Sequence, residues 1–179
     1  IPFRLKSPAT AFPRHKIISP FYKNGERIIK RNGINYEVDL SEGIDLSLFL
    51  FGSFQSHVSK MKFTSLNDAE IIFDIGANFG IMSLQFALNS PKAKVYAFEP
   101  THYALSKLQK NLSLNPDLGK RIIPINTFVS SQTENNPVIK AFSSWKVDGS
   151  NSTKEFHPIH CGYAESTAGV ASITLNDFC

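Results

Sequence analysis

Short apolar runs alternate with helically spaced apolar positions from about residue 70 onward. A helical pattern, GIMSLQFALNS, follows the first run, and a second helical segment begins at Pro100, places Leu105, Leu108 and Leu112 on one face, and ends before Pro116. The apolar runs suited to strands are IIFDIG, VYAFEP and RIIPINTFVSS. Strands that alternate with helices in this order predict an α/β fold with a parallel sheet.

The first 70 residues predict a lead-in to this core. Residues 1–26 contain four prolines and no clear periodicity, which indicates an extended arm. Asn32 and Gly33 separate two runs rich in Ile, Tyr and Val, which predicts a β-hairpin. The next segment, GIDLSLFLFGSFQ, predicts a short helix or an extended piece that leads to a loop. We therefore divide the chain into an arm and hairpin at 1–70 and a core at 71–179.

The last fifty residues predict strands without helices between them. NNPVIKAF favours a fourth strand, antiparallel to its neighbour, and the polar segment 143–169 is typical of a hairpin excursion or a mobile loop. The run VASITLNDFC has a strand-like pattern, after which a helix is expected.

Composition and charge exclude several classes of protein. A chain of 179 residues that is 42% hydrophobic suits one globular domain, and its net charge of +4 is scattered, so a nucleic-acid partner is not predicted. Cys161 and Cys179 lack a CxxC partner, and HPIHC lacks further ligands, so neither disulfides nor a metal site are predicted. No apolar stretch reaches membrane-spanning length, and no signal peptide is evident, which favours a cytoplasmic protein without a membrane partner.

The segment FDIGANFG, residues 73–80, carries the clearest chemical signal. In a parallel sheet this strand-to-helix turn lies at the carboxyl edge, where ligands of doubly wound folds bind. Gly76 would let the backbone approach a ligand, and Gly80 would let the helix start close to the strand. Asp74 would repel a pyrophosphate but suits a ligand with an ammonium or sulfonium group.

Glu99 is the partner of this turn, at the end of the second strand and 25 positions after Asp74 (99 minus 74). A carboxylate there can accept hydrogen bonds from a ribose diol, which together with the glycine turn predicts a nucleoside site. The dinucleotide fingerprint GxGxxG requires glycine where this chain has Asn78. A nicotinamide-dependent oxidoreductase is therefore disfavoured.

The order and spacing of FDIGANFGIMSLQFA, VYAFEPTHYALSKLQKNLSLN, IIPINTFVSS and ITLNDF resemble the FkbM-type family of S-adenosylmethionine-dependent methyltransferases. The resemblance implies a Rossmann-like class I sheet and methyl transfer to a hydroxyl of a small molecule or saccharide. It also implies that the methionine end of the cofactor would be lined by Asp74, Gly76, Asn78 and Gly80. Glu99 would hold the ribose, and Thr127 and Phe128 would lie by the adenine.

The chain departs from the family pattern in two places. Gln55 stands where members tend to carry Glu, and the family continues after the LNDF segment into a Lys-Ile-Asp-x-Glu-Gly strand. We expect that fourth core strand, with acceptor-positioning residues and the general base, to follow Cys179. The catalytic residues and the oligomeric state are not predicted. A cofactor-binding fragment or remnant without catalytic activity stays open, as does a glycine turn without any ligand.

Overall fold

The computed structural model describes residues 26–55, 58, 68–135, 137, 139–145, 157 and 162–179. The predicted arm at 1–26 lies outside the described residues except for Glu26, and so does most of the polar segment after residue 145. In the described part of the chain, no helix is long and apolar enough to cross a membrane.

The predicted hairpin is present. Strands β1 (Glu26–Arg31) and β2 (Ile34–Asp39) pair antiparallel, with Arg31 opposite Ile34. The two loop residues, Asn32 and Gly33, have φ of 51° and 85°, as a type I′ turn requires. Helix α2 (Gly43–Phe51) follows, as one of the two predicted alternatives, and ends at Gly52 with φ of 71°.

The parallel sheet is formed by three strands in the order β3-β4-β5. The chain runs through β3 (Ile71–Ile75), α4 (Ile81–Asn89), β4 (Lys94–Phe98), α5 (His102–Ser113), α6 (Pro116–Gly119) and β5 (Ile122–Ile125). This is a βαβαβ unit, the repeating half of a Rossmann-like sheet, so the predicted α/β class is confirmed. Helix α5 ends at Ser113, before Pro116 as predicted, and Pro116 begins the short α6.

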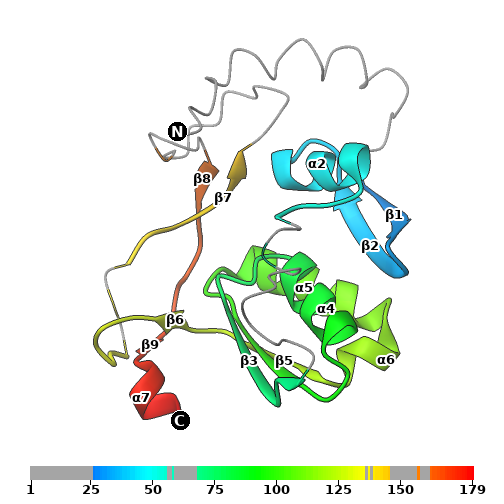
Figure 1. Ribbon diagram of the computed structural model, residues 1–179. Coiled ribbons are helices and arrows are strands. Elements are labelled where there is room, and N and C mark those ends of the chain that lie inside the picture. The colour runs from blue at the N-terminus through cyan, green and yellow to red at the C-terminus, as the bar shows by residue number, and fades with distance from the viewer. Residues whose placement is uncertain are drawn as a thin grey trace, which may run out of the picture.

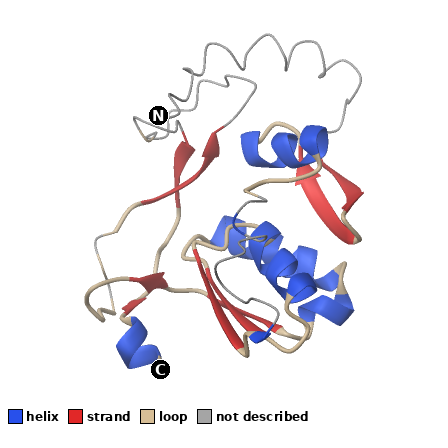
Figure 2. Ribbon diagram, viewed as in Figure 1, coloured by secondary structure: helices blue, strands red, loops and turns tan. Residues whose placement is uncertain are grey.

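The region after β5 differs from the prediction. The third apolar run splits into β5 and β6 (Phe128–Val129), and β6 pairs in parallel with β9 (Ser172–Ile173). The predicted fourth strand begins only at Ala141, as β7 (Ala141–Trp145), and its antiparallel partner is β8 (Gly162–Glu165). These pairs stand apart from the three-stranded sheet (Figures 1 and 2). The strand-like run at the C-terminus contains β9 and then continues as a helical turn, α7 (Leu175–Phe178).

One hydrophobic core joins the hairpin to the parallel unit. It contains Ile34, Tyr36 and Val38 from β2 together with Leu84 and Leu108 from α4 and α5. Strand β2 presents these side chains alternately, and each is at most 1% exposed. Strand β2 contacts both α5 and α2, so the hairpin and α2 pack on the same body as the sheet.

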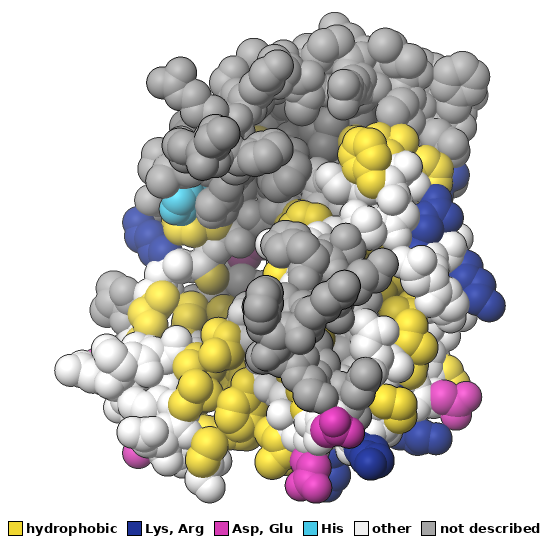
Figure 3. Space-filling model, in the orientation of Figure 1, with side chains coloured by type: hydrophobic (Ala, Val, Ile, Leu, Met, Phe, Trp, Pro, Cys, Tyr) yellow, Lys and Arg dark blue, Asp and Glu magenta, His cyan; other side chains and the backbone are white. Residues whose placement is uncertain are grey.

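Hydrophobic side chains also gather on the face between α7 and the sheet (Figure 3). The ring of Phe178 in α7 lies 5.7, 5.4 and 5.0 Å from the rings of Phe73, Tyr96 and Phe98, all edge to face. Strand β3 lies at the edge of the three-stranded sheet, and Ile71 is 59% exposed there. The helical turn α7 therefore covers part of one face of the sheet.

Candidate cofactor site

The turn between β3 and α4 has an unusual backbone. Gly76, Asn78 and Gly80 have φ of 78°, 50° and 89°, so three of five consecutive residues are left-handed. The N–H groups of Gly76 and Ala77 both donate to the carbonyl oxygen of Phe98 at 3.0 Å, which holds the turn against the end of β4. A Cβ at Gly76 would meet nothing within 4 Å, so this side of the turn is open to a ligand.

Gly80 was predicted to let the helix start close to the strand, but in the structure it allows a close contact with helix α5. A Cβ at this position would lie 2.4 Å from Cδ1 of Leu108 on α5. The close approach is thus between the start of α4 and helix α5, in addition to the left-handed φ that favours glycine. Leu108 itself is fully buried.

Asp74 lies beneath the turn. Its Oδ2 accepts a hydrogen bond of 2.5 Å from the Ser83 hydroxyl of α4, and the side chain is buried. Burial raises the pKa of Asp74, the hydrogen bonds from Ser83 oppose that rise, and the charge of Glu99 adds to it. Asp74 is not among the described residues that line the two cavities below, and its printed hydrogen bond links the end of β3 to α4. Its place at the methionine end of the cofactor stays a prediction.

Glu99 connects the two turns of the βαβ unit. Its Oε2 accepts from the Asn78 N–H at 2.9 Å, and its Oε1 accepts from the Thr101 N–H at 2.8 Å and the Thr101 hydroxyl at 2.6 Å. A carboxylate has about four acceptor positions, so one remains for a ligand. The sequence predicts Glu99 only as a ligand group, which stays a prediction here, and the structure adds a role in the fold.

Two cavities lie on either side of Gly76 and Asn78. The first, here called the Glu99 cavity, has a volume of about 240 Å³ and is also lined by Glu99, Thr101 and Tyr103, and by Ala141–Ser144 of β7. The second, the Gln55 cavity, has a volume of about 230 Å³ and is lined by Gln55 and the first residues of α4. Gly76 and Asn78 line both cavities, so a ligand that crosses the turn would contact both.

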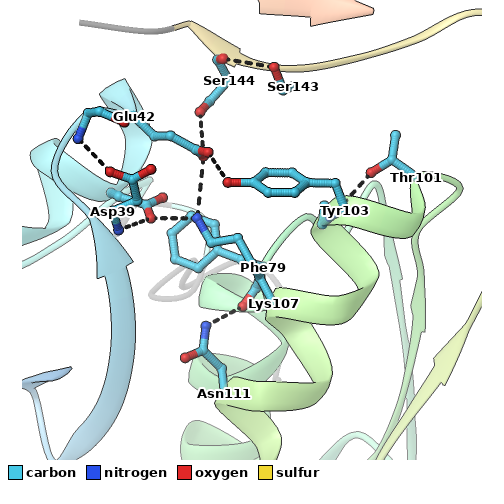
Figure 4. Close-up of polar contacts among 12 residues, drawn as sticks. Asp39, Glu42, Phe79, Thr101, Tyr103, Lys107, Asn111, Ser143 and Ser144 are labelled. Atoms are coloured by element: carbon cyan, nitrogen blue, oxygen red, sulfur yellow. Dashed lines mark hydrogen bonds and ion pairs between the residues drawn. The ribbon is translucent and has the colours of Figure 1, made fainter. Parts of the chain in front are cut away.

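Glu42 completes the Glu99 cavity on the side of the hairpin. Its Oε1 accepts from the Tyr103 hydroxyl, and its Oε2 accepts from the Ser144 hydroxyl at 3.0 Å and pairs with Lys107 Nζ at 3.3 Å (Figure 4). Glu42 is buried, with 3% of its side chain exposed. It therefore ties the end of the hairpin to α5 and to β7.

Lys107 serves a second buried acid. Its Nζ lies 2.7 Å from Oδ2 of Asp45, which is fully buried, and 4.9 Å from the centre of the Phe79 ring. Burial raises the pKa of Asp45 to about 6, with Lys107 lowering it and Glu42 raising it. A third cavity, of about 280 Å³, lies on the other side of Tyr103 and Lys107, against the hairpin.

Sequence reasoning missed Glu42 and Ser144. Their hydrogen bond joins residues 102 positions apart, and no local pattern marks either of them. Tyr103 and Lys107 are four positions apart in α5, and this spacing alone could have placed them on one helix face.

Thr127 and Phe128 lie elsewhere in the structure. The Thr127 hydroxyl donates to the carbonyl oxygen of Ala171 at 2.7 Å, and the Phe128 N–H donates to the same carbonyl at 3.0 Å. Both residues are buried. Neither Thr127 nor Phe128 is among the described residues that line the Glu99 and Gln55 cavities. Their place by an adenine stays a prediction.

The sequence predicts no metal site in the HPIHC segment, residues 157–161, and only His157 of that segment is described. Among the described residues, no group of His, Cys, Asp and Glu has the arrangement of a metal site. His160 and Cys161 of the HPIHC segment are not described.

Comparison with known proteins gives short and partial likenesses. No family model matches the chain. A stretch of 47 residues is 45% identical to Methyltransferase sdnD of Sordaria araneosa, and it covers 26% of this chain and 18% of that protein.

Two solved structures are similar in fold. M. jannaschii TYW2 in complex with AdoMet has 24% sequence identity and a TM-score of 0.43, over 57% of this chain and 43% of that one. The putative transferase PH0793 from Pyrococcus horikoshii has 20% identity and a TM-score of 0.45, over 67% of this chain and 48% of that one. The chain thus spans less than half the length of these proteins.

Proposed function

We propose that the chain is the cofactor-binding part of an S-adenosylmethionine-dependent methyltransferase that methylates a hydroxyl oxygen of a small molecule or saccharide. The observation that carries the proposal is the buried Glu99 carboxylate at the end of β4. It lies beside an open glycine turn, lines a cavity, and has one acceptor position left for a ribose hydroxyl. The local identity to a protein named as a methyltransferase supports the same assignment.

The residues of the two cavities suit the parts of this cofactor. Glu99 would hold the ribose, and the open face at Gly76 would let the ligand approach the backbone between the two cavities. When bound, the cofactor supplies an electrophilic methyl group on its sulfonium. The protein would contribute alignment and partial exclusion of water, with β7 and Glu42 forming the wall opposite the turn.

Asn78 argues against a nicotinamide cofactor. Its side chain stands where the dinucleotide fingerprint needs a glycine that allows close approach of a pyrophosphate. The carboxylates of Glu99 and Glu42 in the same lining would also repel that group. A cationic nucleoside ligand fits this charge better.

The test is a thermal shift with defined ligands. S-adenosylmethionine or S-adenosylhomocysteine at about 100 times its dissociation constant should stabilise the protein by roughly 2.7 kcal/mol, through preferential binding to the folded state. NAD at the same concentration should leave the melting temperature unchanged. A shift with NAD and none with the other two compounds would reverse the assignment.

Replacement of Glu99 by Gln tests the residue that carries the proposal. Loss of the charged acceptor should weaken binding of S-adenosylhomocysteine by roughly tenfold to a hundredfold, measured by isothermal titration calorimetry. Glu70→Gln is the control, because Glu70 is exposed just before the opposite end of β3. Equal affinities in Glu99→Gln and Glu70→Gln would remove Glu99 from the binding site.

A further inference from the structure

The Gln55 cavity differs from the Glu99 cavity and from the third cavity in the chemistry of its lining. Most of its described lining residues have apolar side chains, which are Ile44, Phe54, Ala77, Phe79, Ile81 and Met82. The described lining of the Glu99 cavity carries carboxylates and hydroxyl groups, and that of the third cavity is mostly charged. Because apolar walls favour apolar ligand surface and offer no partner to a buried polar group, these cavities suit different ligands.

The walls of the Gln55 cavity come from three parts of the chain. Ile44 lies in the first turn of α2, Phe54 follows α2, and Met82 lies in the first turn of α4. All three side chains are partly buried and pack against the hydrophobic core. Because they rest on a close-packed core, the apolar surface that they leave exposed keeps its position when a ligand enters.

Two polar contacts anchor these walls on α5. Asp45, next to Ile44, pairs with Lys107 at 2.7 Å, which ties α2 to α5. Asn111 of α5 donates to the Phe79 carbonyl at 2.8 Å, which ties the glycine turn to the same helix. A cavity that is formed before the ligand arrives loses little free energy to ordering when the ligand binds.

The described lining also offers two amide side chains, Gln55 and Asn78. Each has a carbonyl oxygen that can accept a hydrogen bond from a hydroxyl group. An alcohol or phenol needs one such acceptor, whereas a saccharide buries several hydroxyl groups that each require a partner. The lining therefore favours a ligand with one hydroxyl group on an apolar body.

The Gln55 cavity is next to the proposed position of the cofactor. Gly76 and Asn78 line both this cavity and the Glu99 cavity. The cofactor would reach the Gln55 cavity along these two residues, and the walls at Ile44, Phe54 and Met82 would then contact the acceptor. An acceptor held there would lie beside the cofactor, as transfer of a methyl group requires.

We propose that the Gln55 cavity is the acceptor subsite of the methyltransferase and that it selects an uncharged alcohol or phenol with an apolar body over a saccharide. The inference rests on the proposed function, and it chooses between the two classes of acceptor named there. The apolar side chains of Ile44, Phe54 and Met82 make the choice.

The experiment measures binding of two uncharged probes to the protein in the presence of saturating S-adenosylhomocysteine. The probe 1-naphthol represents the apolar acceptors, and methyl α-glucopyranoside represents the saccharides. Isothermal titration calorimetry should show that 1-naphthol binds at least about tenfold more tightly than the glucoside, because apolar walls favour burial of its apolar area.

Variants of Met82 locate the bound probe. Met82→Gln keeps the length of the side chain and makes it polar, so the affinity for 1-naphthol should fall by about fivefold or more. Met82→Leu preserves the apolar volume and should stay within about twofold of the wild type. Leu88→Gln is the matched control in the same helix and should leave the affinity unchanged, because Leu88 is 42% exposed and is not in the described lining.

A second measurement does not depend on the stability of Met82→Gln. The chain contains two methionines, Met61 and Met82, so the NMR spectrum of protein labelled with ¹³C at the methionine methyl groups is simple, and Met82→Leu identifies the Met82 signal. We expect 1-naphthol to shift this signal, because its aromatic ring would lie against the Met82 side chain. The glucoside at the same concentration should leave the signal in place.

The outcomes separate this inference from the proposed function. Tighter binding of the glucoside, or no binding of either probe, would overturn the acceptor subsite, while bound S-adenosylhomocysteine would still uphold the cofactor assignment. A 1-naphthol complex in which the Met82 signal does not move would overturn it as well, since the probe would then bind elsewhere. Absence of S-adenosylhomocysteine binding would overturn the proposed function and this inference together.

Discussion

Gly80 shows how a single residue permits the close packing on which the site depends. A Cβ at Gly80 would come within 2.4 Å of Leu108 Cδ1, and its φ of 89° is unfavourable for other residues. We expect Gly80→Ala to lower the free energy of unfolding by roughly 2–4 kcal/mol, measured by urea denaturation.

Gly33→Ala is the matched control. Gly33 has φ of 85° but open space around it, so it should lose only about 1–2 kcal/mol. Equal losses would show that the contact with Leu108 has no energetic weight.

Asp45 gives the molecule a specific dependence on pH. Burial raises its pKa from 3.8 to about 6. Because the folded-state pKa lies above the unfolded one, the folded protein holds the extra proton between these values. The contribution of Asp45 to stability is therefore largest at acidic pH and is lost as the pH rises through about 6.

The variant Asp45→Asn removes this titration. The free energy of unfolding of the wild type relative to Asp45→Asn should decline between about pH 4 and about pH 7. Urea midpoints at several pH values would measure the difference. A difference that stays constant or rises over this range would show that the pKa of Asp45 is not raised in the folded protein.

At the scale of elements, helix α5 organises the molecule. Its Leu108 packs against the start of α4, and Tyr103 and Lys107 bind Glu42 after the hairpin. Asn111, fully buried, accepts from the Glu37 N–H at 2.7 Å and donates to the Phe79 carbonyl at 2.8 Å. One helix thus aligns the hairpin, the glycine turn and the wall of the Glu99 cavity.

The helical turn α7 is expected to stabilise the sheet through Phe178. Its ring contacts the rings of Phe73, Tyr96 and Phe98 at 5.0 to 5.7 Å. Phe178→Ala should therefore lower the free energy of unfolding by about 1–3 kcal/mol, and Phe178→Leu should lose less because it keeps most of the apolar area. Thermal or urea denaturation would measure both. A loss below about 0.5 kcal/mol for Phe178→Ala would mean that α7 does not dock on the sheet in solution.

For the whole molecule, local patterns predicted local structure well. The turn residues Asn32 and Gly33 define the hairpin through their left-handed φ, and the alternation of strand and helix from Ile71 onward gives the βαβαβ unit. The sequence predicts the turn at Gly76 and the acid Glu99 at the same edge of the sheet, and the structure joins them through the Asn78 N–H, which donates to Glu99.

The remaining features depend on contacts between distant segments. The pairing of β7 with β8 and of β6 with β9, and the contact of Glu42 with Ser144, arise only when distant segments pack together. A single sequence carries no pattern for such contacts. For the same reason the link that Glu99 makes between two turns, through the N–H groups of Asn78 and Thr101, was not visible before the structure.

The most direct test of the account is a crystal structure of the protein with S-adenosylhomocysteine. We predict that the ribose hydroxyls lie within hydrogen-bond distance of Glu99, with the ligand beside Gly76 and Asn78 in the Glu99 and Gln55 cavities. A ligand bound elsewhere, with Glu99 still contacting only Asn78 and Thr101, would contradict the assignment of this turn as the cofactor site.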